Sequence, residues 1–367
     1  MKIMHVTQFL GIGGLEKIIY HIILEQMSQG HEVSLYVYDH DQEWVSFFKK
    51  SGINVITPPM KKPGYDFHLI PTMNKDLCSA DVIHTHDLNP LMYLFPIFFF
   101  KKCFLINHPR LVHTTHGLGH VERFPRYRIF EKYIVPIADK IIGVSEKIGN
   151  FYKEDLKINP RKIKVIDNGI AIYKGVINPE VRRQQKIWLC NRHKMDPNRP
   201  LILSLSRILP LKDQRFLIEA IKKRPDYQLI VVGPPSDQAY YDLLKEKEDS
   251  NIVLVGSQEL VSEYNLGADL YVSASTHEGI PVAVLEAMAV ETPCVVSGIP
   301  GHMTLNQFGN YVAVFPLNDQ NKFLELCDLL LTEKENAQSI AQKARGIVVA
   351  HYSVKKMVDL YMKEYSK

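Results

Sequence analysis

The sequence predicts an α/β protein built from two doubly wound parallel sheets, each covered by helices. Short apolar runs typical of buried strands alternate with helical patterns along the chain, which is the pattern of parallel sheets with crossover helices. The alternation occurs twice, and a polar, basic, proline-bounded stretch without strand pattern separates the two series. A length of 367 residues also favours two domains over one.

The first domain, residues 1–171, is expected to begin with a strand. Its predicted strands are KIMHVTQ, HEVSLYVY, INVITP, DVIHTH, LVHTTHG and KIIGVS, with helices at 15–29 and 42–51. The loop GIGGLEK, residues 11–17, joins the first strand to its helix, but Glu16 occupies the place of the third glycine in a dinucleotide fingerprint. We therefore expect either a tight turn or a loop whose backbone N–H groups bind phosphate, and no NAD.

The second domain, residues 200–350, repeats this order. Its predicted strands are PLILSLSRI, YQLIVVG, NIVLVG, DLYVSAS and TPCVVSG, with helices at 213–223, 237–248, 259–266 and 281–290. Residues 172–199 are expected to form a linker with a helix, and residues 351–367 a helix that crosses back to the first domain. Two Rossmann-like domains facing a central cleft would direct the carboxyl ends of both sheets into it, where ligands of open α/β sheets bind.

Composition indicates an ordinary globular protein, 46% hydrophobic and 23% charged. Five cysteines without a CxxC pair favour reduced thiols and a cytoplasmic location. The N-terminus carries His5, Thr7 and Gln8, which interrupt the apolar run that a signal peptide needs. The longest apolar run, residues 91–100, contains Pro96 and is much shorter than the roughly 20 residues that span a bilayer.

The segment HEGIPVAVLEAMA, residues 277–289, contains two glutamates in an otherwise apolar context. Pro281 suits the first position of a helix, so Glu278 is expected in a loop and Glu286 within a buried helix. A buried carboxylate is costly unless donors surround it, and the vicinal hydroxyls of a sugar would supply them. The helix N-terminus beside Glu278 suits a phosphate, so the segment indicates a nucleotide sugar.

Two cations follow a predicted strand in SLSRILPLKD, namely Arg207 and Lys212. In isolation they would be read as surface charges. At the carboxyl end of a parallel strand, however, they could neutralise a diphosphate, with Arg207 as a bidentate fork and Lys212 as a point charge.

Histidines gather after two strands of the first domain, in HTHD (His84, His86, Asp87) and HTTHGLGH (His113, His116, His120). Structural zinc usually recruits cysteine, so we expect several of these side chains to be hydrogen-bonded at strand ends and one to face substrate. The sequence Asp39-His40-Asp41 could hold a divalent cation, although a solvated loop is favoured. We therefore expect no metal site.

Several motifs in order resemble glycosyltransferase family 4, the retaining group 1 transferases of the GT-B fold, over essentially the whole chain. The motifs are GGLE in the first loop, VIDNGI at 165–170, the Arg207/Lys212 pair, GADLYVSAS and EGIPVAVLEAMA. The last two together are the most specific. The resemblance implies two Rossmann-like domains that face a central cleft.

It also implies roles for individual residues. Glu278 would contact hydroxyls of the donor sugar and His116 would lie beside the transferred sugar, which makes these the catalytic candidates. The donor-binding candidates are Arg207, Lys212, Glu286, Gly13, Gly14, Gly279, Ile280, Pro281 and Gly256, and the acceptor-side candidates are Glu16 and His86. Cations and a helix N-terminus can stabilise the departing diphosphate without metal, so no cofactor is expected, and a UDP-sugar is favoured over a GDP-sugar.

The expected enzyme is a retaining hexosyl- or N-acetylhexosaminyl-transferase that moves a sugar from a nucleoside diphosphate to a glycan or lipid-linked acceptor. Its setting would be the synthesis of a cell-surface polysaccharide or glycolipid. The alternatives are a nucleotide-sugar epimerase of the GT-B fold and a nonenzymatic sugar-binding relative. Retention of all four charged positions argues against the last alternative.

Residues 91–164 combine aromatic and basic residues. Residues 101–164 hold 14 Lys and Arg against 6 Asp and Glu, whereas the whole chain has a net charge of only +4. In PLMYLFPIFFFKK and RFPRYRIF aromatics lie beside cations, as on surfaces that bind anionic membranes. A solvated basic face over a buried helix is the alternative. Nucleic acid is a poorer partner because no recognition motif is present.

Overall fold

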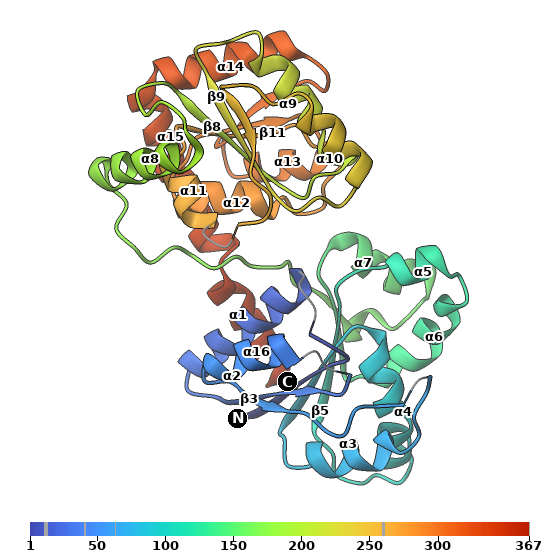
Figure 1. The fold of residues 1–367 in the computed structure, drawn as a ribbon. Coiled ribbons are helices and arrows are strands. Elements are labelled where there is room, and N and C mark those ends of the chain that lie inside the picture. Colours follow the sequence, from blue (N-terminus) through green and yellow to red (C-terminus); the bar gives the residue numbers. More distant parts are fainter. Residues whose placement is uncertain (11–13, 40–41, 63, 259–260, 367) are drawn as a thin grey trace. The chain divides into compact units, whose positions relative to one another are not determined.

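The computed structural model describes residues 1–10, 14–39, 42–62, 64–258 and 261–366. The chain forms two compact units, Met1–Gly169 with Val354–Lys367 and Ile170–Ser353 (Figure 1). The first unit therefore includes the C-terminal helix. Each unit is a parallel sheet with flanking helices, which is the α/β architecture expected from the alternating pattern.

The first unit contains a seven-stranded sheet in the order β3-β2-β1-β4-β5-β6-β7. Its strands are β1 Lys2–Thr7, β2 Glu32–Val37, β3 Asn54–Ile56, β4 Val82–His86, β5 Arg110–Thr115, β6 Lys140–Gly143 and β7 Ile163–Val165. Its helices are α1 Gly14–Ser28, α2 Gln42–Lys50, α3 Leu69–Leu77, α4 Leu88–Cys103, α5 Gly119–Arg123, α6 Tyr127–Ile134, α7 Glu146–Asn150 and α16 Val354–Tyr365, with short turns η1 Val135–Ile137, η2 Phe151–Asp155 and η3 Pro160–Lys162. All six predicted strands are present, and β7 is an additional edge strand.

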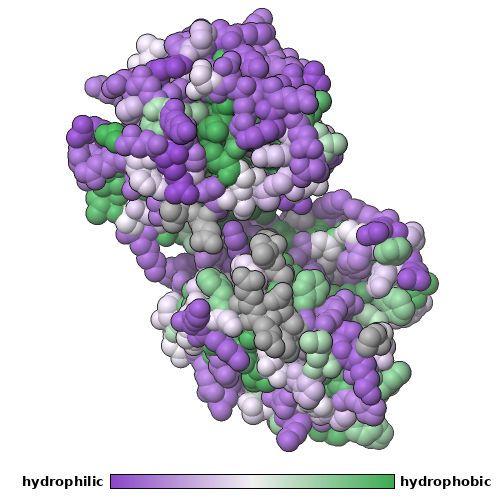
Figure 2. Space-filling model, in the orientation of Figure 1, coloured by the Kyte–Doolittle hydropathy of each residue, from purple (hydrophilic) through white to green (hydrophobic). Residues whose placement is uncertain are grey.

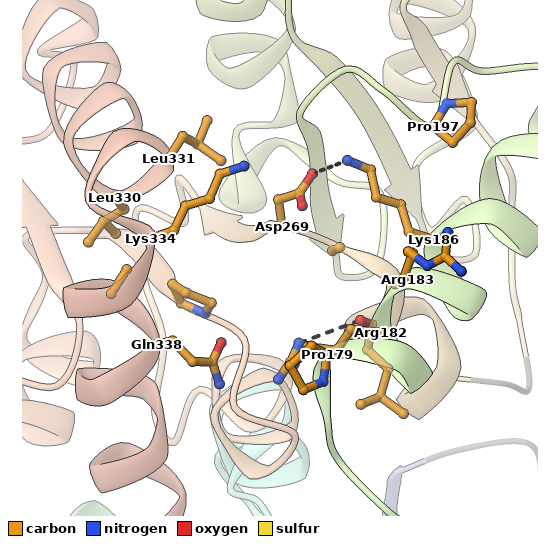
Figure 3. Close-up of a pocket in the computed structure, with 15 residues that line it drawn as sticks. Pro179, Arg182, Arg183, Lys186, Pro197, Asp269, Leu330, Leu331, Lys334 and Gln338 are labelled. Atoms are coloured by element: carbon orange, nitrogen blue, oxygen red, sulfur yellow. Dashed lines mark hydrogen bonds and ion pairs between the residues drawn. The ribbon is translucent and has the colours of Figure 1, made fainter.

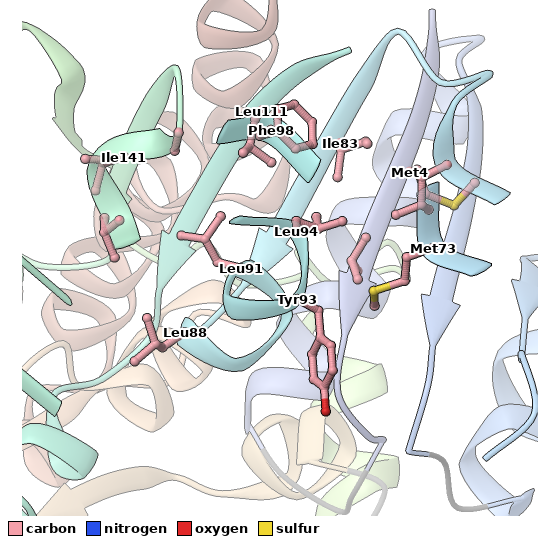
Figure 4. Close-up of a cluster of buried hydrophobic side chains, with 14 of the residues drawn as sticks. Met4, Met73, Ile83, Leu88, Leu91, Tyr93, Leu94, Phe98, Leu111 and Ile141 are labelled. Atoms are coloured by element: carbon pink, nitrogen blue, oxygen red, sulfur yellow. The ribbon is translucent and has the colours of Figure 1, made fainter. Parts of the chain in front are cut away.

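The first sheet is covered by helices on both faces, and its strands bury polar as well as apolar side chains. Figure 4 shows one face, where α4 packs against the strands. The side chains of α4 in this cluster are Leu88, Leu91, Leu94 and Phe98, and the strands supply Met4, Ile83, Leu111 and Ile141. The spacing of three to four residues along α4 is that of one helix face. On the other face, α1, α2 and α16 share a second cluster.

The second unit contains a six-stranded sheet in the order β10-β9-β8-β11-β12-β13. Its strands are β8 Leu201–Leu205, β9 Gln228–Val232, β10 Ile252–Leu254, β11 Leu270–Ser273, β12 Cys294–Ser297 and β13 Ala313–Phe315. Its helices are α8 Pro179–His193, α9 Gln214–Ile221, α10 Gln238–Lys245, α11 Val261–Gly267, α12 Val282–Ala289, α13 Pro300–Met303, α14 Gln320–Thr332 and α15 Lys334–His351, with turns η4 Pro210–Lys212 and η5 Thr304–Asn306. The edge strand β13 is additional to the five predicted strands.

Residues 172–199 were expected to form a linker with a helix; that helix is α8, which belongs to the second unit. Asn178 caps it by accepting a hydrogen bond from the Val181 backbone at 2.8 Å. Gly267 allows α8 to approach α11, because a Cβ there would lie 2.5 Å from the Leu189 side chain. The stretch is therefore a packed helix preceded by a short connection.

The strand order of each sheet reverses next to its first strand, between β1 and β4 and between β8 and β11. Ligands of open α/β sheets bind outside the carboxyl ends of strands at such switch points. In the first unit the loops there follow Thr7 and His86, and in the second they follow Leu205 and Ser273. Within the described ranges, none of the helices combines the length and apolar character that crossing a bilayer requires.

Candidate functional site

A cavity of about 260 Å³ lies at the switch point of the second sheet. Its walls come from the end of β8, the loop after β11 and the start of α12. It brings together all four charged candidates of this domain, Arg207, Lys212, Glu278 and Glu286, and it is also lined by Ile280 and Pro281. The remaining lining residues are Leu205, Ser206, Tyr271, Ser273, Val282, Ala283 and Val284.

Contacts to the backbone of the loop around Arg207 fix the position of this residue at the cavity. The buried side chain of Gln214 donates hydrogen bonds of 2.9 Å to the Arg207 carbonyl and to the Ser206 hydroxyl. Gly233 packs against the same loop with φ +151°, and a Cβ there would lie 1.8 Å from the Ser206 carbonyl oxygen. No side chain fits between these two segments, so Gly233 and Gln214 fix the loop from which the exposed Arg207 side chain extends.

Lys212 and Glu278 form an ion pair with each other through Nζ and Oε1. Both side chains are largely buried, at 17% and 16% exposure. The Ser275 hydroxyl donates to the same Glu278 oxygen at 2.8 Å, and the Ser297 hydroxyl donates to the Ser275 carbonyl at 2.5 Å. Separate roles for Lys212 and Glu278 were expected from the sequence, but here the ammonium group also positions the carboxylate.

The loop that carries Glu278 packs directly against the start of α13. A Cβ on Gly301 would lie 2.6 Å from the Glu278 carbonyl oxygen and 2.8 Å from that of Gly279. Beside this contact, the His302 imidazole Nδ1 lies 2.8 Å from the Ser297 carbonyl oxygen, and burial lowers its pKa. Gly301 and His302 were not among the residues predicted from the sequence, although Gly301 in GIPGHM was a visible signal.

Helix α12 starts one residue later than predicted. Pro281 is its N-cap, with φ −81° and ψ 75°, and its carbonyl accepts hydrogen bonds from Val284 and Leu285. Glu286 is half-buried at the cavity rather than fully enclosed, because its face of α12 is open there. Below it, Tyr271 donates to the Leu205 carbonyl at 3.0 Å.

Burial raises the pKa of Tyr271 well above its usual value, and the nearby charges of Glu278 and Glu286 raise it further. Gly256 does not line the cavity, although its carbonyl accepts a hydrogen bond from Gly233 at 2.8 Å. Its effect on the cavity is therefore through the Gly233 backbone.

A second cavity, of about 620 Å³, lies at the switch point of the first sheet. His116 lines it together with Leu15, Asp87, Leu88, Asn89, Gly117, Gly119, His120, Arg123, Phe124 and Tyr127. The Asp87 carboxylate accepts a hydrogen bond from the His116 backbone at 2.9 Å, which ties the loops after β4 and β5 together. His116 thus lines a cavity, and its position beside the transferred sugar stays a prediction.

The remaining candidates of the first domain are placed differently. His86 is 1% exposed and both of its ring nitrogens bind other histidines, so its side chain does not line the cavity as an acceptor contact would. Glu16 is also buried, at 6% exposure. Gly14 begins α1, whereas Gly13 and Asp41 lie outside the described residues.

Three imidazoles of this unit lie close enough to hold a metal ion, since nitrogen atoms of His5, His84 and His86 are within 4.8 Å of one another. Each of their six ring nitrogens already has a hydrogen-bond partner in the protein. Burial lowers the pKa of His5 to about 4, and it lowers the pKa values of His84 and His86 well below their usual range. These side chains are therefore neutral, hydrogen-bonded groups at neutral pH.

Figure 3 shows another cavity of the second unit, of about 440 Å³. Two of its lining cations, Lys186 and Arg182, bind neighbouring protein groups. Lys186 forms an ion pair of 2.7 Å with Asp269, and the Arg182 guanidinium donates to the carbonyls of Val290 and Leu266.

Comparisons with known proteins agree with this geometry. The family model described as "Glycosyl transferases group 1" matches residues 190–347, and the one described as "Glycosyltransferase Family 4" matches residues 12–173. The chain is 24% identical to the UDP-Gal:alpha-D-GlcNAc-diphosphoundecaprenol alpha-1,3-galactosyltransferase of Escherichia coli, over 68% of this chain and 67% of that protein. It is 22% identical to the GDP-mannose:cellobiosyl-diphosphopolyprenol alpha-mannosyltransferase of Xanthomonas oryzae pv. oryzae, over 100% and 96% of the two chains.

The fold is shared with solved structures. The structure of Anabaena Alr3699/HepE in complex with UDP superposes with a TM-score of 0.81 at 18% identity, and the alignment covers 100% of both chains. A glycosyltransferase from Rickettsia africae superposes with a TM-score of 0.79 at 19% identity, over 99% of this chain and 97% of that one.

Proposed function

This chain belongs to the group 1 glycosyltransferases, and on that premise we propose that it transfers a hexose or N-acetylhexosamine, with retention, to a lipid-linked glycan. The observation that carries the proposal is the cavity in which Arg207, Lys212, Glu278 and Glu286 meet at the switch point of the second sheet. The setting of the reaction would be the synthesis of a cell-surface polysaccharide or glycolipid.

In the proposed complex, Arg207 and Lys212 bind the donor diphosphate, while Glu278 and Glu286 accept hydrogen bonds from sugar and ribose hydroxyls. The ion pair between Lys212 and Glu278 supports this arrangement because it orients the carboxylate. On donor binding, the ammonium group would be shared between carboxylate and phosphate. The cavity volume of about 260 Å³ suits part of a nucleotide sugar.

The proposed reaction breaks the bond between the sugar anomeric carbon and the departing phosphate oxygen. The acceptor hydroxyl attacks the same face of the sugar, and the leaving phosphate takes its proton. Arg207 and Lys212 stabilise the charge that develops on the phosphate, as preorganised cations do. We therefore expect turnover to survive excess EDTA. A loss of activity that Mn²⁺ or Mg²⁺ restores would contradict the metal-free proposal.

The acceptor class is supported by the two relatives, since both are named for acceptors joined to a lipid through a diphosphate. Their names give different donors, UDP-Gal and GDP-mannose, and we propose a UDP-sugar for this chain. The test measures nucleotide release from UDP- and GDP-sugars with and without a polyprenyl-diphosphate-linked saccharide. Release that requires the acceptor supports transfer. Acceptor-independent change of the sugar would instead indicate an epimerase, and no turnover of any donor would contradict the proposal.

A lipid-linked acceptor calls for contact with a membrane, and the first unit has a suitable surface. Exposed apolar side chains at the end of α4 and on α6 form what we call the aromatic surface, namely Phe99, Phe100, Phe104, Leu105, Ile129, Phe130 and Tyr133. Leu105 is 92% exposed. Figure 2 shows green, hydrophobic residues of this unit in the region that α4 and α6 occupy in Figure 1.

Cations accompany these aromatics. Lys132 lies over the Tyr133 ring at 5.8 Å, and Arg126 lies over the Phe124 ring at 5.6 Å. Aromatic side chains beside cations suit the interface of an anionic bilayer, so we propose that the aromatic surface docks there.

Flotation with vesicles of increasing anionic lipid content tests the docking. Binding is expected to rise with anionic lipid, to fall with salt, and to weaken in Phe100→Ser/Phe104→Ser and in Arg123→Ser/Arg126→Ser/Arg128→Ser. Val349→Ser removes a similarly exposed apolar side chain of the second unit and serves as the control. Equal binding of all variants to the vesicles would contradict the docking surface, and so would the absence of binding to vesicles of every composition.

A further inference from the structure

A continuous chain of hydrogen bonds links His116 at the first cavity to Gln26 on α1. His116 Nε2 lies 3.0 Å from His86 Nδ1, and His86 Nε2 lies 2.9 Å from His5 Nδ1. The remaining nitrogen of His5, Nε2, lies 2.8 Å from Gln26 Oε1. Gln26, His5 and His86 are almost completely buried, with exposures of 0%, 0% and 1%, so water does not compete for these bonds.

The amide of Gln26 determines the donor-to-acceptor direction of this series of hydrogen bonds. Its nitrogen donates to the Tyr365 hydroxyl at 3.3 Å, and that hydroxyl lies 2.5 Å from His84 Nδ1. The amide oxygen therefore faces His5, and an amide oxygen can only accept. His5 must then carry its proton on Nε2, since a hydrogen bond needs one donor.

A neutral imidazole has one donor and one acceptor nitrogen, so each step fixes the next. With its proton on Nε2, His5 offers Nδ1 as an acceptor, and His86 must donate from Nε2. His86 then accepts on Nδ1, and His116 must donate from Nε2. Burial lowers the pKa values of all three histidines, which keeps each at one proton.

We propose that Gln26, acting through His5 and His86, sets the tautomer of His116 so that its Nδ1 presents a lone pair to the first cavity. Among the described residues, Nδ1 of His116 has no hydrogen-bond partner, whereas Nε2 binds His86. His116 is therefore a hydrogen-bond acceptor for a hydroxyl or N–H group of the substrate. Gln26, His5 and His86 are positioning residues, and the inference that His116 meets substrate rests on the proposed function.

A metal ion on His5, His84 and His86 is the competing explanation for the cluster. A metal ion would take one nitrogen of each imidazole and so replace a hydrogen bond of each. Examples are the bond from His5 to Gln26, the bond from His86 to His5 or His116, and the 2.7 Å bond from His84 to Thr114. The three imidazoles contribute no negative charge, so a buried dication would be left uncompensated among them. The hydrogen-bonded chain satisfies every nitrogen without that cost.

The test is ¹⁵N NMR of the full-length protein labelled at histidine, in which the shifts of Nδ1 and Nε2 report which nitrogen carries the proton. The His116 signal is assigned by its loss in His116→Gln. The expected result at neutral pH is a proton on Nε2 of His116. A proton on Nδ1, or metal bound to the cluster in purified protein, would overturn the proposal.

Gln26→Met tests the origin of the direction. Without the amide acceptor, a proton on His5 Nε2 would be a buried donor without a partner, which proteins avoid. The donor and acceptor roles along the three histidines should therefore reverse, which moves the His116 proton to Nδ1. Thr85→Val removes the 2.9 Å hydrogen bond from His113 Nδ1, which lies outside this chain, and should leave the tautomer of His116 unchanged. A folded Gln26→Met protein with the wild-type tautomer would contradict the proposal, and the wild-type spectrum decides the tautomer even where a variant does not fold.

Kinetics separates this inference from the proposed function. Loss of one ordinary hydrogen bond to substrate should lower kcat/KM of Gln26→Met about tenfold. A reversed tautomer with unchanged kcat/KM would support the chain of histidines and contradict the contact between His116 and substrate.

Discussion

The two switch points have the same topology, but the charges of the side chains around them differ. In each sheet the first strand lies between the second and the fourth, as in β2-β1-β4 and β9-β8-β11. At the second sheet, charged side chains line the cavity, and Lys212 and Glu278 compensate each other there. At the first sheet, Asp87, Arg123 and two histidines line the cavity, and burial keeps the neighbouring imidazoles of His5, His84 and His86 neutral. Topology thus places functional side chains, whereas burial decides whether they act as charges or as hydrogen-bonding groups.

The largest effect is expected from breaking the charged site. Glu278→Gln removes the charge that pairs with Lys212 and contacts the proposed donor, and Arg207→Ala removes a cation from the leaving group. Loss of one such preorganised contact typically costs about 10² to 10³ in rate, so steady-state turnover of folded protein should fall by that factor. Glu286→Gln and Lys212→Ala should behave alike.

Lys186→Met is the matched control, because Lys186 and Asp269 form a similarly buried ion pair at the other cavity of the same unit. That variant should lose stability and retain its rate per folded molecule. Equal losses of rate in Lys186→Met and Lys212→Ala would contradict the prediction that only the cavity beside Arg207 takes part in the reaction.

A smaller effect is expected when acid charges the neutral site. Burial lowers the pKa values of His5 and His113 to about 4, below the usual 6.5, so between these pH values the unfolded chain binds more protons than the folded unit. Stability should therefore be complete above pH 6.5 and fall toward pH 4, by about 1.4 kcal/mol per pH unit for each histidine.

Hydrogen exchange in β1, β4 and β5, corrected for intrinsic rates, measures this loss, and His113→Gln should make the dependence shallower. Protection that does not change over this range would show that the histidines of the first unit are not buried neutral groups.

The smallest effect is expected from moving the charged site rather than removing a charge. Gly301→Ala places a Cβ 2.6 Å from the Glu278 carbonyl oxygen, so the loop must shift and turnover should fall about tenfold, since displacement of a catalytic group is costly. Gly346→Ala lies in a helix with nothing within 4 Å of the added carbon. It should stabilise the protein by up to about 1 kcal/mol and leave turnover unchanged. Unimpaired Gly301→Ala would show that this contact does not position Glu278.

Most of the fold could be predicted because apolar strands and helical patterns alternate so regularly. The edge strands β7 and β13, of three residues each, were missed, although β3 and β10 are equally short and were predicted. Helix α8 was anticipated only as part of a linker, because its sequence is polar and its docking depends on the close approach at Gly267.

The charged candidates could be found because Glu278 and Glu286 stand out in an apolar segment. The residues that position these side chains could not be found in the same way. They are Gln214, Gly233 and Gly301, which act through contacts that are not visible in the sequence. His86 was an acceptor-side candidate, but its ring nitrogens bind His5 and His116 and its side chain is buried, which its position after a strand did not reveal.

The central claim is that the charged cavity of the second unit binds the nucleotide of the donor. Hydrogen–deuterium exchange of the full chain with and without UDP tests it most directly, because it reports on both units in one experiment. We expect UDP to protect residues 205–212 and 273–286, with the protection abolished in Lys212→Ala, and to leave exchange in β1, β4 and β5 unchanged. Protection confined to the first unit, or protection that persists in Lys212→Ala and Arg207→Ala alike, would contradict it.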